Sequence, residues 1–351
     1  MTRSTFAALA FAAALAGPAA AQEVTLRLHQ FLPETSAVPA NILQGWIDAV
    51  EEQSGGRIAV EHYPSMQLGG TPQELVDQVQ DGIADVVWTL PGYTPGRFPS
   101  LEVMELPFIL EDAGAGSRAL WRLAESRGLF ESELAGMHVL ALWVHGPGVI
   151  HANAPVALPE DLTGLNLRAP TRTVTTLLSS LGANAVGMPV PAVPEAVQRG
   201  VIDGAVIPWE VTTSIHMAEL VDHHTEFEGP FLYAATFLFA MNEATYEGLP
   251  DDLKAVIDAN AGLDFSGAAG ASQQALDAPG RALAVEAGNA IETVTGEALA
   301  TWHAAAAPVV AAWEAEMDDA GRDGTGLFEE AQALIAEEMA TAGIDAGAAS
   351  E

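Results

Sequence analysis

The stretch from residue 164 to residue 211 constrains the fold more than any other part of this 351-residue chain. Short apolar runs at 165–169, 185–188 and 203–207 have the length of buried strands. The segments between them have helical patterns, and the first places four apolar residues on one face: Val174, Leu177, Leu178 and Leu181. A β-α-β-α-β order is typical of a parallel sheet with right-handed crossovers. In such sheets ligands bind beyond the carboxyl ends of the strands.

Arg168 lies at one of these strand ends, directly before the strand-breaking Pro170. A guanidinium group can hold a carboxylate through two parallel hydrogen bonds, so the position indicates either an acid-binding site or a structural ion pair. The chain has 13 Lys and Arg against 47 Asp and Glu, a formal net charge of −34. This charge argues against nucleic acid as a partner. Such acidity is typical of a solvated surface, which is the interpretation we favour. The alternative is a field that repels small anions, in which case an acidic ligand needs a local cation.

The N-terminal residues have the pattern of an export signal. Arg3 precedes an apolar run at 6–15, and Ala19, Ala20 and Ala21 follow a Gly-Pro break. This pattern predicts a secretory signal peptide over residues 1–21 and a mature chain that begins at Gln22. The apolar run is too short to span a bilayer. Because the chain contains no cysteine, core burial rather than disulfide bonds must stabilise the exported fold.

Several separated motifs agree in order and spacing with one known family. They are LTGLNLRAP at 162–170, LGA at 181–183 with Met188, GVIDG at 200–204, YPSMQLGG at 63–70, PGY at 91–93, LPF at 106–108 and LPDDL at 249–253. Together these motifs resemble the solute-binding proteins of TRAP transporters, which are periplasmic receptors of the dicarboxylate-receptor type. The resemblance covers nearly the whole mature chain and makes Arg168 the expected partner of the ligand's carboxylate.

The resemblance implies an α/β, two-lobed fold of the periplasmic-binding-protein type. Each lobe would be a mixed sheet flanked by helices, and a long helix would bridge both lobes, with a kink or break near Pro279. We expect lobe I to contain residues 22–143 and 236–275, and lobe II to contain residues 144–235 and 276–345. Such a receptor is a periplasmic monomer that closes around a small organic acid and delivers it to the membrane permease subunits of a TRAP transporter.

Two positions depart from the pattern of many relatives. Position 148 is Gly where these relatives carry a second arginine, and position 207 is Ile where they carry a ligand-binding asparagine. A second carboxylate would therefore be unpaired, at a cost of roughly 1–3 kcal/mol or more. We predict that Arg168 binds an aromatic or other hydrophobic monocarboxylate. The other expected ligand contacts are His29, Phe31, Trp88, Tyr93, Trp143, His145, Trp209 and Phe237.

Other functions remain open at this stage. A C4-dicarboxylate or sugar-acid receptor of the same family is the main alternative, and an exported sensor domain or enzyme is a remoter one. The sequence has no G-x-S-x-G motif, no cysteine nucleophile and no dinucleotide fingerprint after a strand, so we expect no enzyme activity and no cofactor. His223 and His224 face opposite ways on a predicted strand and are poor co-ligands, so we expect no metal. Each tryptophan can equally be a core residue.

Overall fold

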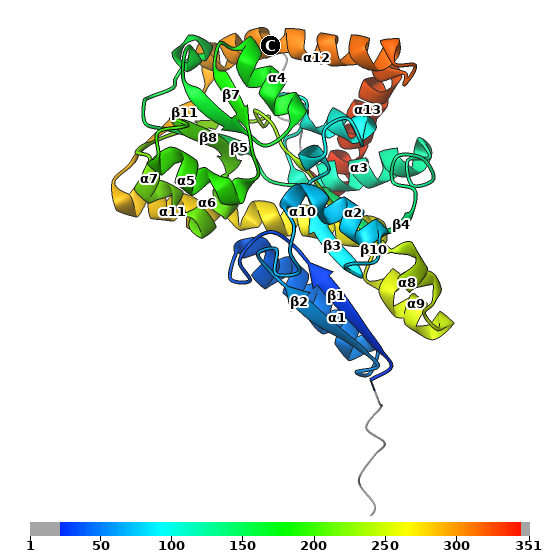
Figure 1. Ribbon diagram of the computed structural model, residues 1–351. Coiled ribbons are helices and arrows are strands. Elements are labelled where there is room, and N and C mark those ends of the chain that lie inside the picture. Colours follow the sequence, from blue (N-terminus) through cyan, green and yellow to red (C-terminus); the bar gives the residue numbers. More distant parts are fainter. Residues whose placement is uncertain (1–21, 345–351) are drawn as a thin grey trace, which may run out of the picture.

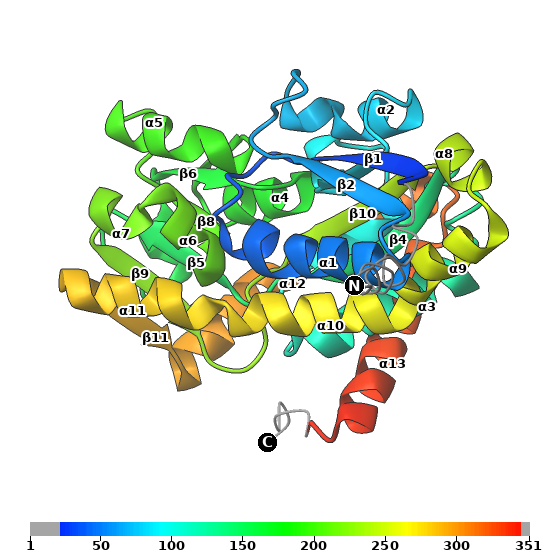
Figure 2. The same ribbon diagram turned by 90° about the horizontal axis from the view of Figure 1, so that it is seen from below.

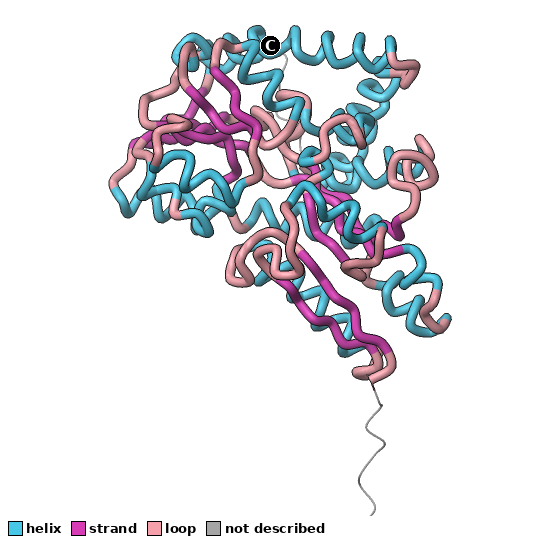
Figure 3. Tube along the Cα trace, viewed as in Figure 1, coloured by secondary structure: helices cyan, strands magenta, loops and turns pink. Residues whose placement is uncertain are grey.

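The computed structural model describes residues 22–344 as two mixed sheets with helices packed around each (Figure 1). This arrangement confirms the predicted α/β fold class. The predicted signal peptide, residues 1–21, lies outside the described residues. The strands gather into two separate groups (Figure 3).

The first sheet has the strand order β2-β1-β3-β10-β4. Strand β1 is parallel to β2 and β3, and β10 is antiparallel to both of its neighbours. Because β10 is far along the chain, the polypeptide leaves this sheet after β4 and returns to it, as the sequence predicted. The strands are β1 Val24–His29, β2 Ile58–Tyr63, β3 Val86–Thr89, β4 Met137–Val144 and β10 Thr236–Asn242.

The second sheet has the strand order β11-β9-β5-β8-β6-β7. Strand β6 is parallel to β7 and to β8, which confirms the predicted β-α-β-α-β unit. In this register Arg168 lies beside Val186 of β7 and Ala205 of β8. The strands are β5 Gly148–Ala152, β6 Asn166–Ala169, β7 Asn184–Gly187, β8 Gly204–Pro208, β9 His223–Phe227 and β11 Ala290–Val294.

The helices cover both sheets, and their ends follow local capping rules. Thr71 and Glu74 form a capping box at the start of η2. The Thr171 side chain accepts a hydrogen bond from the backbone N–H of Val174 and caps α4. The helices up to β10 are α1 Gln44–Gln53, α2 Leu75–Gln80, α3 Ala113–Ser126, α4 Arg172–Ser180, α5 Val193–Gln198, α6 Trp209–Ile215 and α7 Met217–Leu220, together with the short turns η1 Pro39–Leu43, η2 Pro72–Glu74, η3 Pro91–Tyr93, η4 Pro99–Glu105, η5 Pro159–Leu162 and η6 Val190–Ala192.

A run of helices after β10 connects the two sheets. Helix α10 packs on α3 and β4 of the first sheet, and α11 packs on α6 and β11 of the second (Figure 2). The two helices meet at Leu276, three residues before Pro279. A proline ring collides with the carbonyl group four residues earlier, here Ala275, so the break falls at that point. The predicted break in the bridging helix is confirmed. The helices of this region are α8 Glu243–Glu247, α9 Asp251–Ala259, α10 Gly262–Ala275 and α11 Asp277–Ala287.

Two long helices complete the described chain, α12 Gly296–Asp319 and α13 Gly324–Ala342. Arg118 and Arg122 of α3 both bind the carboxylate of Glu338, which attaches α13 to the helices of the first sheet. Within residues 22–344, no helix combines the length and the hydropathy that crossing a membrane would require.

Candidate ligand-binding site

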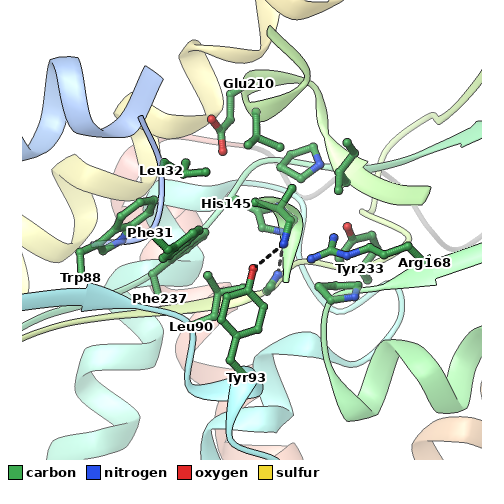
Figure 4. Close-up of a pocket in the computed structure, with 16 residues that line it drawn as sticks. Phe31, Leu32, Trp88, Leu90, Tyr93, His145, Arg168, Glu210, Tyr233 and Phe237 are labelled. Atoms are coloured by element: carbon green, nitrogen blue, oxygen red, sulfur yellow. Dashed lines mark hydrogen bonds between the residues drawn. The ribbon is translucent and has the colours of Figure 1, made fainter. Parts of the chain in front are cut away.

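Residues from both sheets line one pocket, which we call the central pocket (Figure 4). It contains about 380 Å³ of space free of atoms, part of it open to solvent. The lining combines aromatic and aliphatic side chains with a few buried polar groups. Its residues are Phe31, Leu32, Trp88, Leu90, Tyr93, His145, Arg168, Pro170, Val190, Ile207, Pro208, Glu210, Val211, Tyr233, Ala235 and Phe237.

Stacked rings form the aromatic wall of the central pocket. The Trp88 ring stacks on Phe31 with a centroid distance of 4.9 Å and on Phe237 with a distance of 5.1 Å. Tyr93 meets Phe31 edge to face at 5.6 Å. Trp88 belongs to β3 and Phe237 to the antiparallel β10, so two adjacent strands of the first sheet hold this wall. Flat, rigid aromatic surfaces of this kind favour a flat apolar ligand.

Arg168 provides the positive charge of the pocket and is only 2 % exposed. Its Nε donates to the carbonyl oxygen of Met188 at 2.9 Å, and Nη1 donates to that of Val206 at 3.1 Å. These two bonds fix the plane of the guanidinium group and leave further N–H groups for other acceptors.

The other arginines of the described chain are engaged with carboxylates. Every arginine within residues 22–344 except Arg168 forms an ion pair with an Asp or Glu side chain. Arg97 pairs with Asp77, and Arg172 pairs with Glu102 and Glu316. Arg168 is therefore the arginine whose charge is available to an anionic ligand.

Two tyrosines lie near Arg168. The Tyr93 hydroxyl accepts a hydrogen bond from the backbone N–H of Val190 at 3.1 Å, which links η3 to η6. The Tyr233 hydroxyl is buried and has no hydrogen-bond partner among the described residues. Burial raises the pKa of both phenols, so both hydroxyls keep their protons at neutral pH. Tyr233 can thus donate a hydrogen bond to a group held by Arg168.

His145 separates the aromatic wall from Arg168 in Figure 4. Its Nε2 accepts from the backbone N–H of Ala235 at 2.9 Å, so its Nδ1 carries the proton and donates to the carbonyl oxygen of Gly146. Desolvation lowers the pKa of His145 to about 4, and the nearby charge of Arg168 acts in the same direction. His145 is therefore neutral and already fully bonded to backbone groups.

Glu210 is a buried carboxyl group in the central pocket and is 3 % exposed. Its Oε1 accepts a hydrogen bond from Nε2 of Gln273 at 2.6 Å. Its Oε2 has no partner within residues 22–344. Desolvation, together with the nearby carboxyl group of Asp277, raises the pKa of Glu210 to about 8.

Six of the nine predicted contact residues line the central pocket: Phe31, Trp88, Tyr93, His145, Arg168 and Phe237. The other three predicted residues do not line this pocket, because their side chains lie elsewhere. His29 is fully buried and bonded on both ring nitrogens, to Gln78 and to the backbone N–H of Leu68. Trp143 lies behind Trp88 and donates to Gln273. Trp209 packs against His151 and His224 and donates to Glu226.

Tyr233 and Glu210 are the polar pocket residues that the sequence did not place at the site. Tyr233 follows no recognised motif and precedes β10 by three residues. Glu210 is not among the ligand contacts that the sequence predicts. Its position two residues beyond β8, at the carboxyl end of a parallel strand, was the signal that could have identified it. Within the described chain, no group of three or more His, Asp or Glu side chains is arranged to hold a metal ion.

Comparison with known proteins supports the resemblance found in the motifs. The family model "Bacterial extracellular solute-binding protein, family 7", also called DctP, matches residues 30–316. The chain belongs to this DctP family. The C4-dicarboxylate-binding periplasmic protein DctP of Rhodobacter capsulatus is 26 % identical over 304 residues, which cover 86 % of this chain and 90 % of that protein.

Two solved structures of TRAP solute-binding proteins are more similar to this DctP-family chain. One, from Rhodoferax ferrireducens T118, is in complex with copurified benzoate; it is 47 % identical, has a TM-score of 0.89 and covers 91 % of this chain and 99 % of its own. The other, from a marine metagenome, is described as specific for aromatic acid ligands and contains 3-hydroxybenzoate. It is 44 % identical, with a TM-score of 0.88 and the same coverage. The DctP-family chain therefore has the fold of TRAP solute-binding proteins, as predicted.

Proposed function

We propose that this DctP-family protein is the periplasmic receptor of a TRAP transporter and binds an aromatic monocarboxylate in the central pocket. The observation that carries the proposal is the combination of one available guanidinium group, on Arg168, with a wall of stacked rings. Arg168 holds the carboxylate, and Phe31, Trp88 and Phe237 contact the ring. The ligands of the two similar structures, benzoate and 3-hydroxybenzoate, have this chemistry.

The energetics of this pocket favour such a ligand. A benzoate ring buries ~100–150 Å² of apolar surface, which is worth about 2.5–4 kcal/mol. A charge-assisted bond to Arg168 adds about 1.5–3 kcal/mol. Association itself costs several kcal/mol of translational and rotational freedom. Neither contribution offsets this cost alone, so ring and carboxylate must act together for binding.

A C4-dicarboxylate fits the same pocket poorly. Its second carboxylate would have no second arginine in the lining to pair with. Burying an unpaired charge is strongly unfavourable, whereas burying an apolar ring is favourable. Titration calorimetry with benzoate, a hexuronate and succinate tests the proposal. We expect the affinity to fall in that order, and tight succinate binding with none for benzoate would overturn it.

The proposal includes the receptor cycle. The two parts, residues 22–143 with 236–275 and residues 144–235 with 276–345, close around the ligand as lobes and deliver it to the permease subunits. Hydrogen bonding between Tyr93 and Val190 and the ion pair between Glu102 and Arg172 link these two parts beside the pocket. We further propose that the receptor is monomeric and has no enzyme activity. X-ray scattering should show a smaller radius of gyration when benzoate is present, and an unchanged radius at saturation would contradict lobe closure.

A further inference from the structure

The central pocket has two polar ends. Arg168 lies at one of them, and Glu210 lies at the other. Figure 4 shows the Glu210 carboxyl group on the side of the pocket with Leu32 and Phe31, away from Arg168 and Tyr233. A monocarboxylate bound by Arg168 needs no polar partner at this end. A buried carboxyl oxygen with no partner among residues 22–344 is costly unless a ligand group meets it.

A chain of hydrogen bonds determines which Glu210 oxygen is available. The indole N–H of Trp143 can only donate, and it donates to Oε1 of Gln273 at 2.7 Å. The amide nitrogen of Gln273 must then face Glu210, where it donates to Oε1 at 2.6 Å. Because Oε1 is an acceptor in this bond, the proton of a neutral Glu210 resides on Oε2.

The surroundings of Glu210 favour its neutral form. Its backbone N–H donates to Oδ1 of Asp277 at 2.8 Å, so a second carboxyl group lies close by. Burial and this neighbour raise the pKa of Glu210 to about 8. At pH 7 Oε2 thus offers an O–H donor to the pocket, as a carboxylic acid kept neutral by its environment does.

We propose that Glu210 binds a hydroxyl group on the ring of the ligand, through a hydrogen bond donated by Oε2. This inference rests on the proposed function and narrows it to hydroxylated aromatic acids. A hydroxyl group fits because it can accept this bond without bringing charge. A second carboxylate would instead bring a charge to an end of the pocket where no cation of the lining offsets it, and burying an unpaired charge is costly.

The position of the hydroxyl on the ring follows from the separation of the two polar ends. A hydroxyl ortho to the carboxylate would lie at the Arg168 end and bond to its own carboxylate. A hydroxyl meta or para to the carboxylate extends away from Arg168. We therefore expect 3-hydroxybenzoate or 4-hydroxybenzoate to bind more tightly than benzoate and 2-hydroxybenzoate.

Calorimetry with benzoate, the three hydroxybenzoates and isophthalate tests this inference. The readout is the affinity of the preferred hydroxybenzoate divided by that of benzoate. One buried hydrogen bond is worth ~1 kcal/mol, so we expect a ratio of about 5 or more for the native protein. Glu210→Gln keeps an acceptor toward Gln273 and a donor toward the pocket, and should retain the ratio. Glu210→Met removes the donor and should reduce the ratio to about 1.

Two further variants make the outcome decisive. Glu105→Gln is the matched control. Glu105 is also a buried carboxyl group with a pKa of about 8, but it does not line the central pocket. The affinity ratio of this variant should equal that of the native protein. Trp143→Phe leaves Glu210 in place but releases the Gln273 amide, and should lower the ratio even if Glu210→Met fails to fold. A ratio that stays at the native value in Glu210→Met and Trp143→Phe, or isophthalate binding above both hydroxybenzoates, would overturn the inference. If benzoate and all three hydroxybenzoates fail to bind the native protein, the proposed function itself fails.

Discussion

The Tyr233 ring occupies the space that any side chain at position 148 would need: a Cβ atom added to Gly148 would lie 2.1 Å from Cε1 of Tyr233. The two residues are also joined by a hydrogen bond of 3.0 Å from the Gly148 N–H to the Tyr233 carbonyl oxygen. The Tyr233 ring therefore leaves no room for a side chain at position 148, where the family resemblance implies a second arginine in many relatives. Tyr233 itself lines the central pocket.

Gly148→Ala should disrupt this packing. The added methyl group would displace the Tyr233 ring, and overpacking a buried site costs about 1–3 kcal/mol. We expect a melting temperature several degrees lower and weaker benzoate binding, measured by calorimetry and thermal unfolding. Gly187→Ala is a suitable control because nothing lies within 4 Å of a Cβ atom there. Equal stability of the two variants would show that Tyr233 can move away at little cost.

Tyr233→Phe tests the hydroxyl group itself. This oxygen lies in the central pocket without a protein partner among the described residues, so its removal leaves no other group unpaired. We expect the ligand carboxylate to lose one hydrogen bond, which corresponds to a roughly 3- to 15-fold weaker affinity. Stability of the empty protein should be unchanged or slightly higher. Undiminished benzoate affinity would mean that the carboxylate contacts Arg168 alone.

Arg168→Lys keeps the charge but loses the planar fork, and should weaken benzoate binding by at least tenfold, about 1.4 kcal/mol. A lysine also cannot reach both the Met188 and the Val206 carbonyl groups in the same way, so some stability is lost. Arg97→Lys is the matched control, because Arg97 pairs with Asp77 outside the pocket lining. A larger loss of affinity in the control than in Arg168→Lys would place the ligand carboxylate elsewhere.

The sequence predicted the backbone better than the directions of side chains. Strand ends and helix breaks follow local rules, so the β-α-β-α-β unit and the break near Pro279 were predicted correctly. Whether a strand-end side chain enters the pocket depends on partners far along the chain. His29 turns toward Gln78, which is 49 residues away in sequence.

The same limit explains why Trp143 and Trp209 do not line the pocket. Trp209 begins α6, and a helix directs successive side chains about 100° apart. Glu210 and Val211 consequently face the pocket while Trp209 faces β9. Trp143 is paired with Phe237 across β4 and β10, but its N–H is bound by Gln273 of the bridging helix α10. No local sequence pattern predicts contacts between residues that lie so far apart in the chain.

The stability of the protein should depend on pH through Glu105. Desolvation raises the pKa of this carboxyl group to about 8 in the folded state, against 4.5 for the ordinary group. Between these values the unfolded state has lost the proton while the folded state keeps it. Folded-state stability is therefore lost as pH rises from 4.5 to 8, by at most about 1.4 kcal/mol per pH unit.

Glu105→Gln isolates this effect, because an amide has no proton to lose and can still accept from the Thr236 N–H. We expect the melting temperature of the variant minus that of the native protein to become more positive from pH 5 to pH 8. Because the two proteins share all other titrating groups, the contributions of those groups cancel in this difference in melting temperature. His145 is one such group, and its lowered pKa affects stability only below pH 6.5. A constant difference across this range would show that Glu105 is already ionised in the folded protein at pH 5.

The contribution of the aromatic wall to ligand affinity can be tested by comparing a substitution of Phe237, which lines the central pocket, with one of Trp209, which does not. Phe237→Leu takes one ring from the stack around Trp88, and aromatic pairs are worth ~0.5–1.5 kcal/mol beyond the area they bury. We expect benzoate affinity to fall about 3- to 15-fold in calorimetry, while a branched aliphatic acid of similar size loses less. Trp209→Phe breaks the bond to Glu226 and should lower only stability, because Trp209 packs on His151 and His224. If Trp209→Phe instead weakens benzoate more than Phe237→Leu does, the ring of the ligand lies against α6 and not against the stack of Phe31, Trp88 and Phe237.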